Sequence, residues 1–126
     1  MQIIYDHQIF SLQKYGGISR YFVEVANHIA ETATVEVKVI APVYFNAYLT
    51  SRSPGVQVIG LKMPAIKFSQ LIYGAANQTL AGLLLPCFEP DLVHETYYAS
   101  KPAKPRGYKL VVTVHDMIHE LFPAEF

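Results

Sequence analysis

Ionisable side chains that could do chemistry stand directly behind three runs of strand-forming residues. Asp6 and His7 follow QIIY, and His94 follows DLV. His115 and Asp116 follow KLVVTV in the same way. An imidazole in such a place can donate a hydrogen bond or a proton near neutral pH. Because the carboxyl ends of parallel strands share one edge of a sheet, these residues predict a polar crevice at that edge.

Two adjacent glycines add a second chemical feature. Gly16 and Gly17, in KYGGISRYF, stand just before a run with helical spacing. A helix N-terminus presents unpaired N–H groups and a partial positive charge, and glycine lacks the Cβ that would keep a phosphate away. The pair does not form GxGxxG, and no P-loop lysine and serine follow it. On spacing alone it predicts either a phosphate contact or a simple turn into the helix.

The histidines also have structural interpretations. Asp116 is suited to cap a helix in DMIHELF, with His115 packed before it, and His94 is suited to a bond with a neighbouring loop. His115 and His119 are four residues apart, as in HExxH, but that motif lies inside a helix and here a strand runs into His115. We therefore predict no metal site. Tyr98 and the tyrosine before it offer rings on which a sugar could stack.

Five runs of residues are predicted to be the strands that hold these side chains. Val35, Val37 and Val39 alternate with Glu36 and Lys38, so we expect this strand to be more exposed than its neighbours. The last run is continuously β-branched, as expected of a central strand covered on both faces. The five predicted ranges are 2–5, 34–42, 56–60, 92–93 and 109–114.

Helical spacing separates most of these strands. Apolar residues recur at intervals of four, three and four from Ile18 to Ile29, which predicts an amphipathic helix after a polar loop. Residues 66–85 predict a second helix, stopped by Pro86, and residues 101–107 a flexible stretch. A short helix is expected between the second and third strands. This order predicts an α/β fold, a Rossmann-like parallel sheet with flanking helices.

Composition excludes some classes of function. The 126 residues carry a formal net charge of zero, so nothing in the overall charge indicates a nucleic acid or an anionic membrane. Cys87 is the only cysteine, which rules out a disulfide framework and fits a reducing compartment. The apolar run LAGLLLP is too short to cross a bilayer. The 52% apolar content is high for a free-standing domain and predicts self-association through surface that another part of a larger protein covers.

Three segments together resemble the N-terminal domain of retaining, nucleotide-sugar-dependent glycosyltransferases of the GT-B fold. They are YDHQIFSLQKYGGISRYFVEVANHI, PDLVHETYY and KLVVTVHDMIHELFP, which span nearly the whole chain in the order of glycosyltransferase family 4, or group 1. The glycine pair is modestly specific by itself and strongly so in combination with the other two segments. The resemblance implies two Rossmann-like domains that face a cleft.

The same resemblance implies roles for individual residues. Gly16 and Gly17 would approach the donor diphosphate. His115 would be the catalytic residue, beside the donor sugar and near the reacting anomeric carbon. The acceptor side and the cleft would be lined by Asp6, His7, Tyr15, His94 and Asp116. No metal or other cofactor is implied, and the nucleotide sugar is a co-substrate.

Partners and location follow from the resemblance as well. Family members are roughly three times this length, so we expect residues 1–126 to be a truncated acceptor-side domain, without the C-terminal donor-binding domain and inactive by itself. The partners would be a nucleotide sugar and a glycan or lipid-linked acceptor, in polysaccharide synthesis. The setting would be the bacterial cytoplasm, with peripheral association at the inner face of the membrane.

Two other interpretations stay open. A GT-B-type nucleotide-sugar epimerase, or another Rossmann enzyme, would share the fold and not the reaction. A non-catalytic binding domain would keep the fold without the chemistry. Nothing in the residues selects the donor sugar, the nucleotide or the acceptor.

Overall fold

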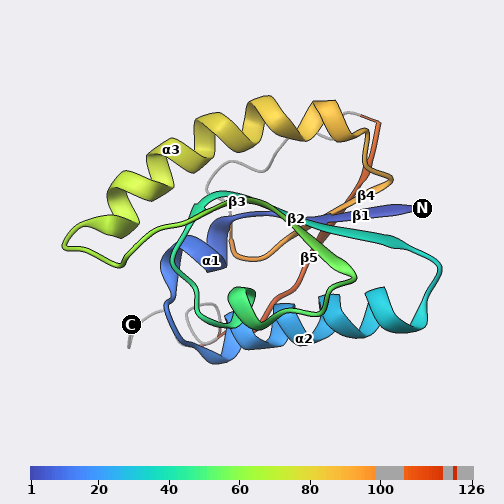
Figure 1. Cartoon of the computed structure of the whole chain (residues 1–126), viewed down its shortest axis with the longest axis horizontal. Helices are drawn as coiled ribbons and strands as arrows, with labels where there is room; N and C mark the ends of the chain where they lie inside the picture. The colour runs from blue at the N-terminus through green and yellow to red at the C-terminus, as the bar shows by residue number, and fades with distance from the viewer. Residues whose placement is uncertain (99–106, 118–120, 122–126) are drawn as a thin grey trace.

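Five parallel strands and the helices beside them form the part of the chain that the computed structural model describes, which is residues 1–98, 107–117 and 121 (Figure 1). The strands are β1 (Gln2–Tyr5), β2 (Glu36–Tyr44), β3 (Val56–Lys62), β4 (Leu92–Glu95) and β5 (Lys109–Val112). The helices are α1 (Gln8–Leu12), α2 (Gly17–Thr32) and α3 (Ser69–Leu84), with the 3-10 helices η1 (Tyr48–Ser51) and η2 (Leu85–Phe88). The predicted α/β class, the five strands and both long helices are confirmed.

The sheet has the order β3-β2-β1-β4-β5, and every neighbouring pair is parallel. The chain adds strands on one side of β1 and then continues on the other side with β4. In open α/β sheets, ligands bind beyond the carboxyl ends of the strands at the place where the order reverses. The fold therefore directs attention to the ends of β1 and β4.

Two apolar layers hold the helices on the sheet. Phe22 and Val23 of α2 pack with Ile3 and Tyr5 of β1 on one face. On the other face Ile4, Ile40 and Val93 lie under residues from α3 and η2, namely Ala81, Leu84, Leu85 and Phe88. Figure 1 shows α2 and α3 on opposite sides of the sheet. The two faces arise because successive side chains of a strand point in opposite directions.

The predicted exposure of the second strand is wrong. β2 lies between β1 and β3, and its side chains are buried from Val37 onward except for half-buried Val43. Lys38 is only 6% exposed because its aliphatic stem is covered, while its ammonium group pairs with Glu36 at the start of the strand. The ammonium nitrogen also lies 5.6 Å from the ring centroid of Phe88. The alternation of charged residues with valines in β2 therefore does not indicate a solvent-facing side of the strand.

The prediction of a covered central strand at residues 109–114 is also wrong. β5 ends at Val112 and lies at the edge of the described sheet, paired with β4. Val112 is 43% exposed and Val114 is 60% exposed. The β-branched run indicated a strand correctly, but the type of residue did not reveal which layers cover it.

The segment expected to be a polar loop, residues 6–15, contains the short helix α1. Its Ile9 and Phe10 are buried in the same core as Phe22, so two apolar residues in a polar stretch were enough to anchor a helical turn. Residues 101–106, most of the stretch 101–107 that is predicted to be flexible, lie outside the described residues.

A buried asparagine fixes α3 to its neighbours. The amide nitrogen of Asn77 donates to the carbonyl oxygen of Val43 at 2.7 Å and to the Ser11 hydroxyl at 2.8 Å. Its oxygen accepts the N–H of Val43 at 2.7 Å. Val43 follows an irregularity in the β2–β3 register, where Gly60 passes so close that a Cβ would lie 1.7 Å from the carbonyl oxygen of Ala41. Asn77 thus satisfies backbone groups at a kink in β2 and joins three elements.

Candidate functional site

Asp6 connects the ends of β1 and β4, where the strand order reverses. Its N–H donates to the carbonyl oxygen of His94 at 3.2 Å. Its carboxylate accepts the N–H of Thr96 at 2.8 Å and the Thr96 hydroxyl at 2.6 Å. The side-chain amide of Gln8 donates to the second carboxylate oxygen at 2.6 Å. Asp6 therefore lies at the carboxyl ends of the strands, as predicted, and its carboxylate bonds the segments that follow β1 and β4.

His94 is half-buried and lies in β4, close to the carboxyl ends of the strands. Its ring stacks on Tyr5 at a centroid distance of 5.2 Å and meets Phe22 edge-on at 5.1 Å. Its Nε2 is 2.7 Å from the hydroxyl oxygen of Thr113, just beyond β5. Burial lowers the pKa of His94, an effect that the Asp6 carboxylate partly opposes. These contacts match the structural interpretation, in which the ring bonds a neighbouring loop.

His115 lies against the first turns of α2. Its ring meets Tyr21 at 5.4 Å and Phe22 at 5.5 Å between centroids, edge-on in both pairs. Its backbone N–H donates to the hydroxyl oxygen of Tyr98 at 3.0 Å, and the N–H of Asp116 donates to the same oxygen at 3.4 Å. The Nε2 atom of His115 is buried and has no hydrogen-bond partner among the described residues. The ring and its backbone are thus both held in place.

His7 lies beside Asp6 at the start of α1. Its carbonyl oxygen accepts the N–H groups of Phe10 and Ser11, each at 3.1 Å. Its Nδ1 is buried without a partner among the described residues. Burial lowers the pKa of His7, and the Asp6 carboxylate opposes that shift. Buried polar atoms without partners are uncommon in folded proteins, so His7 and His115 are the notable side chains of this edge.

The two half-buried histidines, His7 and His94, predict how stability depends on pH. Because the folded pKa of His7 and of His94 is lowered below about 6.5, the unfolded chain binds more protons than the folded chain below that pH. The free energy of unfolding should therefore fall as the pH is lowered through about 6.5. Urea unfolding at about pH 7.5 and about pH 5.5 measures this difference.

A double variant separates this effect from other titrations. His7→Gln with His94→Gln should remove most of the pH dependence in this window, whereas His28→Gln, at an exposed histidine of α2, should leave it intact. The pKa of Glu36 is lowered mainly by its bond with Lys38, so that carboxyl titrates at lower pH. A wild-type stability that stays constant or rises toward pH 5.5 would contradict the expectation.

The two glycines at the N-terminus of α2 have different surroundings. Gly16 has φ 175°, an extended conformation that any residue adopts, so its backbone does not require glycine. A Cβ on Gly16 would lie 2.1 Å from Oε1 of Gln13, which itself accepts the N–H of Ser19 at 3.4 Å. A Cβ on Gly17 would meet nothing within 4 Å. Open space therefore surrounds the Cβ position of Gly17, whereas the Gln13 side chain occupies that of Gly16.

The structure brings together only part of the predicted set. His94 and His115 pack around Phe22 at the end of β1, and the N–H of Asp6 bonds the carbonyl oxygen of His94. Tyr15 lies apart from that cluster, with its ring 65% exposed and edge-on to Tyr48 of η1 at 5.9 Å. The helix predicted after Asp116 lies largely outside the described residues, as does His119.

Several residues that hold the site were not identified from the sequence. Thr96 bonds Asp6 across 90 residues and Thr113 bonds His94 across 19, and no local pattern marks either threonine. Gln13 lies against Gly16 and accepts the N–H of Ser19. Phe22 was recognised only as a core residue, through its helical spacing. Tyr98 was expected to present a ring to a sugar, and the structure shows its hydroxyl bonded to the backbone of His115.

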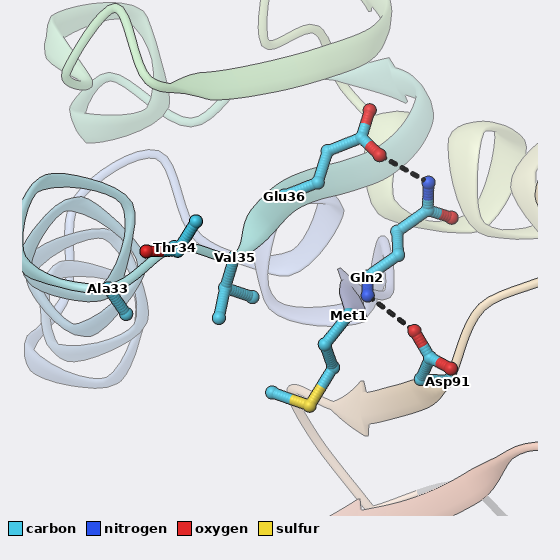
Figure 2. A pocket seen from close by; sticks show the side chains of 7 residues that line it. All are labelled: Met1, Gln2, Ala33, Thr34, Val35, Glu36 and Asp91. Carbon is cyan, nitrogen blue, oxygen red and sulfur yellow. Dashed lines mark hydrogen bonds between the residues drawn. The ribbon is translucent and has the colours of Figure 1, made fainter.

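A hollow of about 560 Å³ lies at the amino ends of the strands, away from the candidate residues at their carboxyl ends (Figure 2). Its lining residues are Met1, Gln2, Ala33, Thr34, Val35, Glu36 and Asp91. The N–H of Gln2 donates to Asp91 at 2.6 Å and its side-chain amide nitrogen to Glu36 at 2.9 Å, while Oε1 of Gln2 is buried without a partner among the described residues. None of the candidate residues lines it. Within the described ranges, no three His, Cys, Asp or Glu residues gather as a metal site would require.

Comparison with models of protein families gives a match. The sequence model described as Glycosyltransferase Family 4 matches residues 15–125. That span includes Gly16, Gly17, His94 and His115, and begins beyond Asp6. No curated protein and no solved structure matches the chain.

Proposed function

Because the chain belongs to glycosyltransferase family 4, we propose that it is the acceptor-side domain of a retaining hexosyltransferase. The enzyme would move a sugar from a nucleotide-sugar donor to a glycan or lipid-linked acceptor in the bacterial cytoplasm. The observation that carries this proposal is the family match over residues 15–125. The polar cluster at the reversal of strand order supports it, because ligands of such sheets bind there.

The start of α2 and the His115 ring are close enough to serve one donor molecule. Tyr21, whose ring meets that of His115, lies one helical turn after Gly17, about 6 Å along the helix axis. A diphosphate at the helix N-terminus would be stabilised by free N–H groups and the helix dipole, both in the bound donor and as the nucleoside diphosphate departs. Such a donor would displace the Gln13 side chain from Ser19.

His115 would act on the sugar end of the donor. Its ring is fixed by Tyr21 and Phe22, and its buried Nε2 has no partner among the described residues. A fixed imidazole there can hydrogen-bond a donor hydroxyl near the anomeric carbon and move a proton. The acceptor would approach from Asp6, His7 and Tyr15, with His94 and Asp116 toward the cleft. The opposite wall, which grips the nucleotide, would come from a separate donor-binding domain.

The test compares the 126-residue chain with the polypeptide that the complete gene encodes. Each is incubated with nucleotide sugars and glycan or lipid-linked acceptors, and nucleoside diphosphate release and product are measured. We expect transfer by the complete polypeptide and none by the 126-residue chain, which under this proposal would hold half of a site. Transfer or tight donor binding by the short chain would overturn this division of the site. An epimerised sugar from the complete polypeptide would favour an epimerase, and binding without turnover a non-catalytic domain.

A further inference from the structure

The hydroxyl group of Tyr98 holds the backbone that carries His115. The N–H groups of His115 and Asp116 donate to its oxygen at 3.0 Å and 3.4 Å, and the hydroxyl donates to the carbonyl oxygen of Asp116 at 3.4 Å. Tyr98 belongs to the segment after β4, and His115 belongs to the segment after β5. The two segments are therefore joined beyond the carboxyl ends of two paired strands.

The segment that presents Tyr98 is itself bonded to the residues that follow β1. The Asp6 carboxylate accepts the N–H and the hydroxyl of Thr96, which is 1% exposed. The side-chain amide of Gln8 donates to the Asp6 carboxylate at 2.6 Å and to the carbonyl oxygen of Tyr97 at 3.0 Å. Both residues before Tyr98 are therefore held by hydrogen bonds, which limits where its hydroxyl group can lie.

The hydroxyl contacts of Tyr98 explain a tyrosine at this position better than its ring contacts do. The residue is 45% exposed, and its ring meets that of Tyr97 at 5.2 Å between centroids. Any aromatic residue could make that contact, and any aromatic residue could stack on a sugar. Among the aromatic side chains, only that of tyrosine has a hydroxyl oxygen that can accept both N–H groups. The bonds therefore favour a role in positioning over a role in stacking.

The place of the His115 imidazole depends on the backbone that Tyr98 holds. The ring meets Tyr21 and Phe22 edge-on, at 5.4 Å and 5.5 Å between centroids. Such contacts orient a ring, whereas hydrogen bonds to the backbone fix where its Cα lies. A displacement of about 1 Å at a reacting group can lower a rate about a hundredfold. Loss of the Tyr98 hydroxyl would therefore misplace the imidazole enough to slow a reaction that needs it.

We propose that Tyr98 is a positioning residue for sugar transfer, which keeps the His115 imidazole at the place where the donor sugar reacts. Tyr98 acts through His115 and does not itself contact the reacting atoms. The inference rests on the proposed function, because sugar transfer is what gives His115 its role. It adds to that function a contribution to turnover from the segment after β4.

Amide hydrogen exchange in the 126-residue chain tests the contact without any sugar. Tyr98→Phe keeps the ring and removes the hydroxyl, so the N–H groups of His115 and Asp116 should exchange at least about tenfold faster. Exchange at Val93, which is 3% exposed within β4, should stay at the wild-type rate. Wild-type exchange rates at His115 in a folded Tyr98→Phe chain would overturn the proposal.

Turnover of the complete enzyme tests the consequence of the contact. Tyr98→Phe should lower kcat by about ten- to a hundredfold and leave the donor KM within about twofold of wild type, because the misplaced group acts in the transition state. Tyr98→Leu should lose about as much as Tyr98→Phe. If the phenylalanine variant kept wild-type turnover and the leucine variant lost it, the ring would stack on the sugar and the proposal would be wrong.

A matched tyrosine separates positioning from a general loss of stability. The Tyr73 hydroxyl also bonds a backbone group, the carbonyl oxygen of Pro64 at 2.9 Å. Tyr73 lies in α3, on the opposite side of the sheet from α2 (Figure 1). Tyr73→Phe should therefore keep wild-type turnover, although it removes a bond of the same kind. An equal loss of turnover in Tyr73→Phe and Tyr98→Phe would contradict a specific role for Tyr98.

A double variant shows whether Tyr98 acts through His115. In the His115→Ala enzyme, adding Tyr98→Phe should change kcat by no more than about twofold, since residues that act as one unit do not have additive effects. Additive losses in an enzyme that transfers sugar would overturn the positioning role alone. A complete polypeptide that transfers no sugar would overturn the proposed function and, with it, any role of Tyr98 in turnover, even where exchange shows the bond.

Discussion

Replacing His115 with alanine in the complete enzyme is expected to lower kcat by about 10²- to 10⁴-fold, the range lost with a group that moves a proton or hydrogen-bonds the reacting centre. The ring is fixed by Tyr21 and Phe22, while its Nε2 is buried without a partner among the described residues. Under the proposed function this nitrogen meets the donor sugar. Initial rates at saturating donor and acceptor measure the effect.

A second histidine on α2 provides the control for this variant. His28 is exposed and lies outside the cluster around Phe22, so His28→Ala should retain wild-type turnover. Circular dichroism and the thermal midpoint should show that both variants are folded. Unchanged turnover in a folded His115→Ala enzyme would remove His115 from the chemistry, and the edge would need another catalytic group.

Replacing Asp6 with alanine is expected to lower the free energy of unfolding by about 3–5 kcal/mol. The carboxylate accepts both the N–H and the hydroxyl of Thr96, which is 1% exposed, and the side-chain amide of Gln8. Alanine would leave buried donors of Thr96 without a partner, and each unmade bond costs about 1–3 kcal/mol, more where the lost partner is charged. Urea unfolding of the 126-residue chain measures the change.

Two further variants define what the Asp6 carboxylate contributes. Asp6→Asn keeps an oxygen that can accept a bond from Thr96, so it should recover part of the loss. Glu24→Ala, at an exposed carboxylate of α2, should change stability by no more than about 0.5 kcal/mol. If Asp6→Ala were as mild as Glu24→Ala, the bonds between the ends of β1 and β4 would not stabilise the fold.

Local patterns predicted the elements well and their surroundings less well. Helical spacing through Phe22 located α2, and β-branched runs located the strands, because both signals reside in neighbouring residues. The cover on each strand depends on partners far along the chain. β2 is buried although charges alternate in it, since the stem of Lys38 is covered, whereas β5 lies at an edge although it is apolar.

The candidate site was predictable in outline only. The rule that ligands bind at the carboxyl ends of parallel strands selected Asp6, His94 and His115, and the fold brings these three to one edge. Their bonds were not predictable, because Asp6 and Thr96 are 90 residues apart and nothing local links them. The different surroundings of Gly16 and Gly17 were also hidden, since they depend on where the Gln13 side chain lies.

The donor KM of Gly17→Ala in the complete enzyme tests the central claim, that the start of α2 faces the donor diphosphate. A Cβ at Gly17 meets nothing within 4 Å, so the fold should be unaffected, and alanine favours a helix more than glycine does. Gly82→Ala in α3, where a Cβ also meets nothing within 4 Å, is the matched control. We predict that Gly17→Ala raises the donor KM at least about tenfold while Gly82→Ala leaves it unchanged. A donor KM that stays at the wild-type value in a folded Gly17→Ala enzyme would contradict the account.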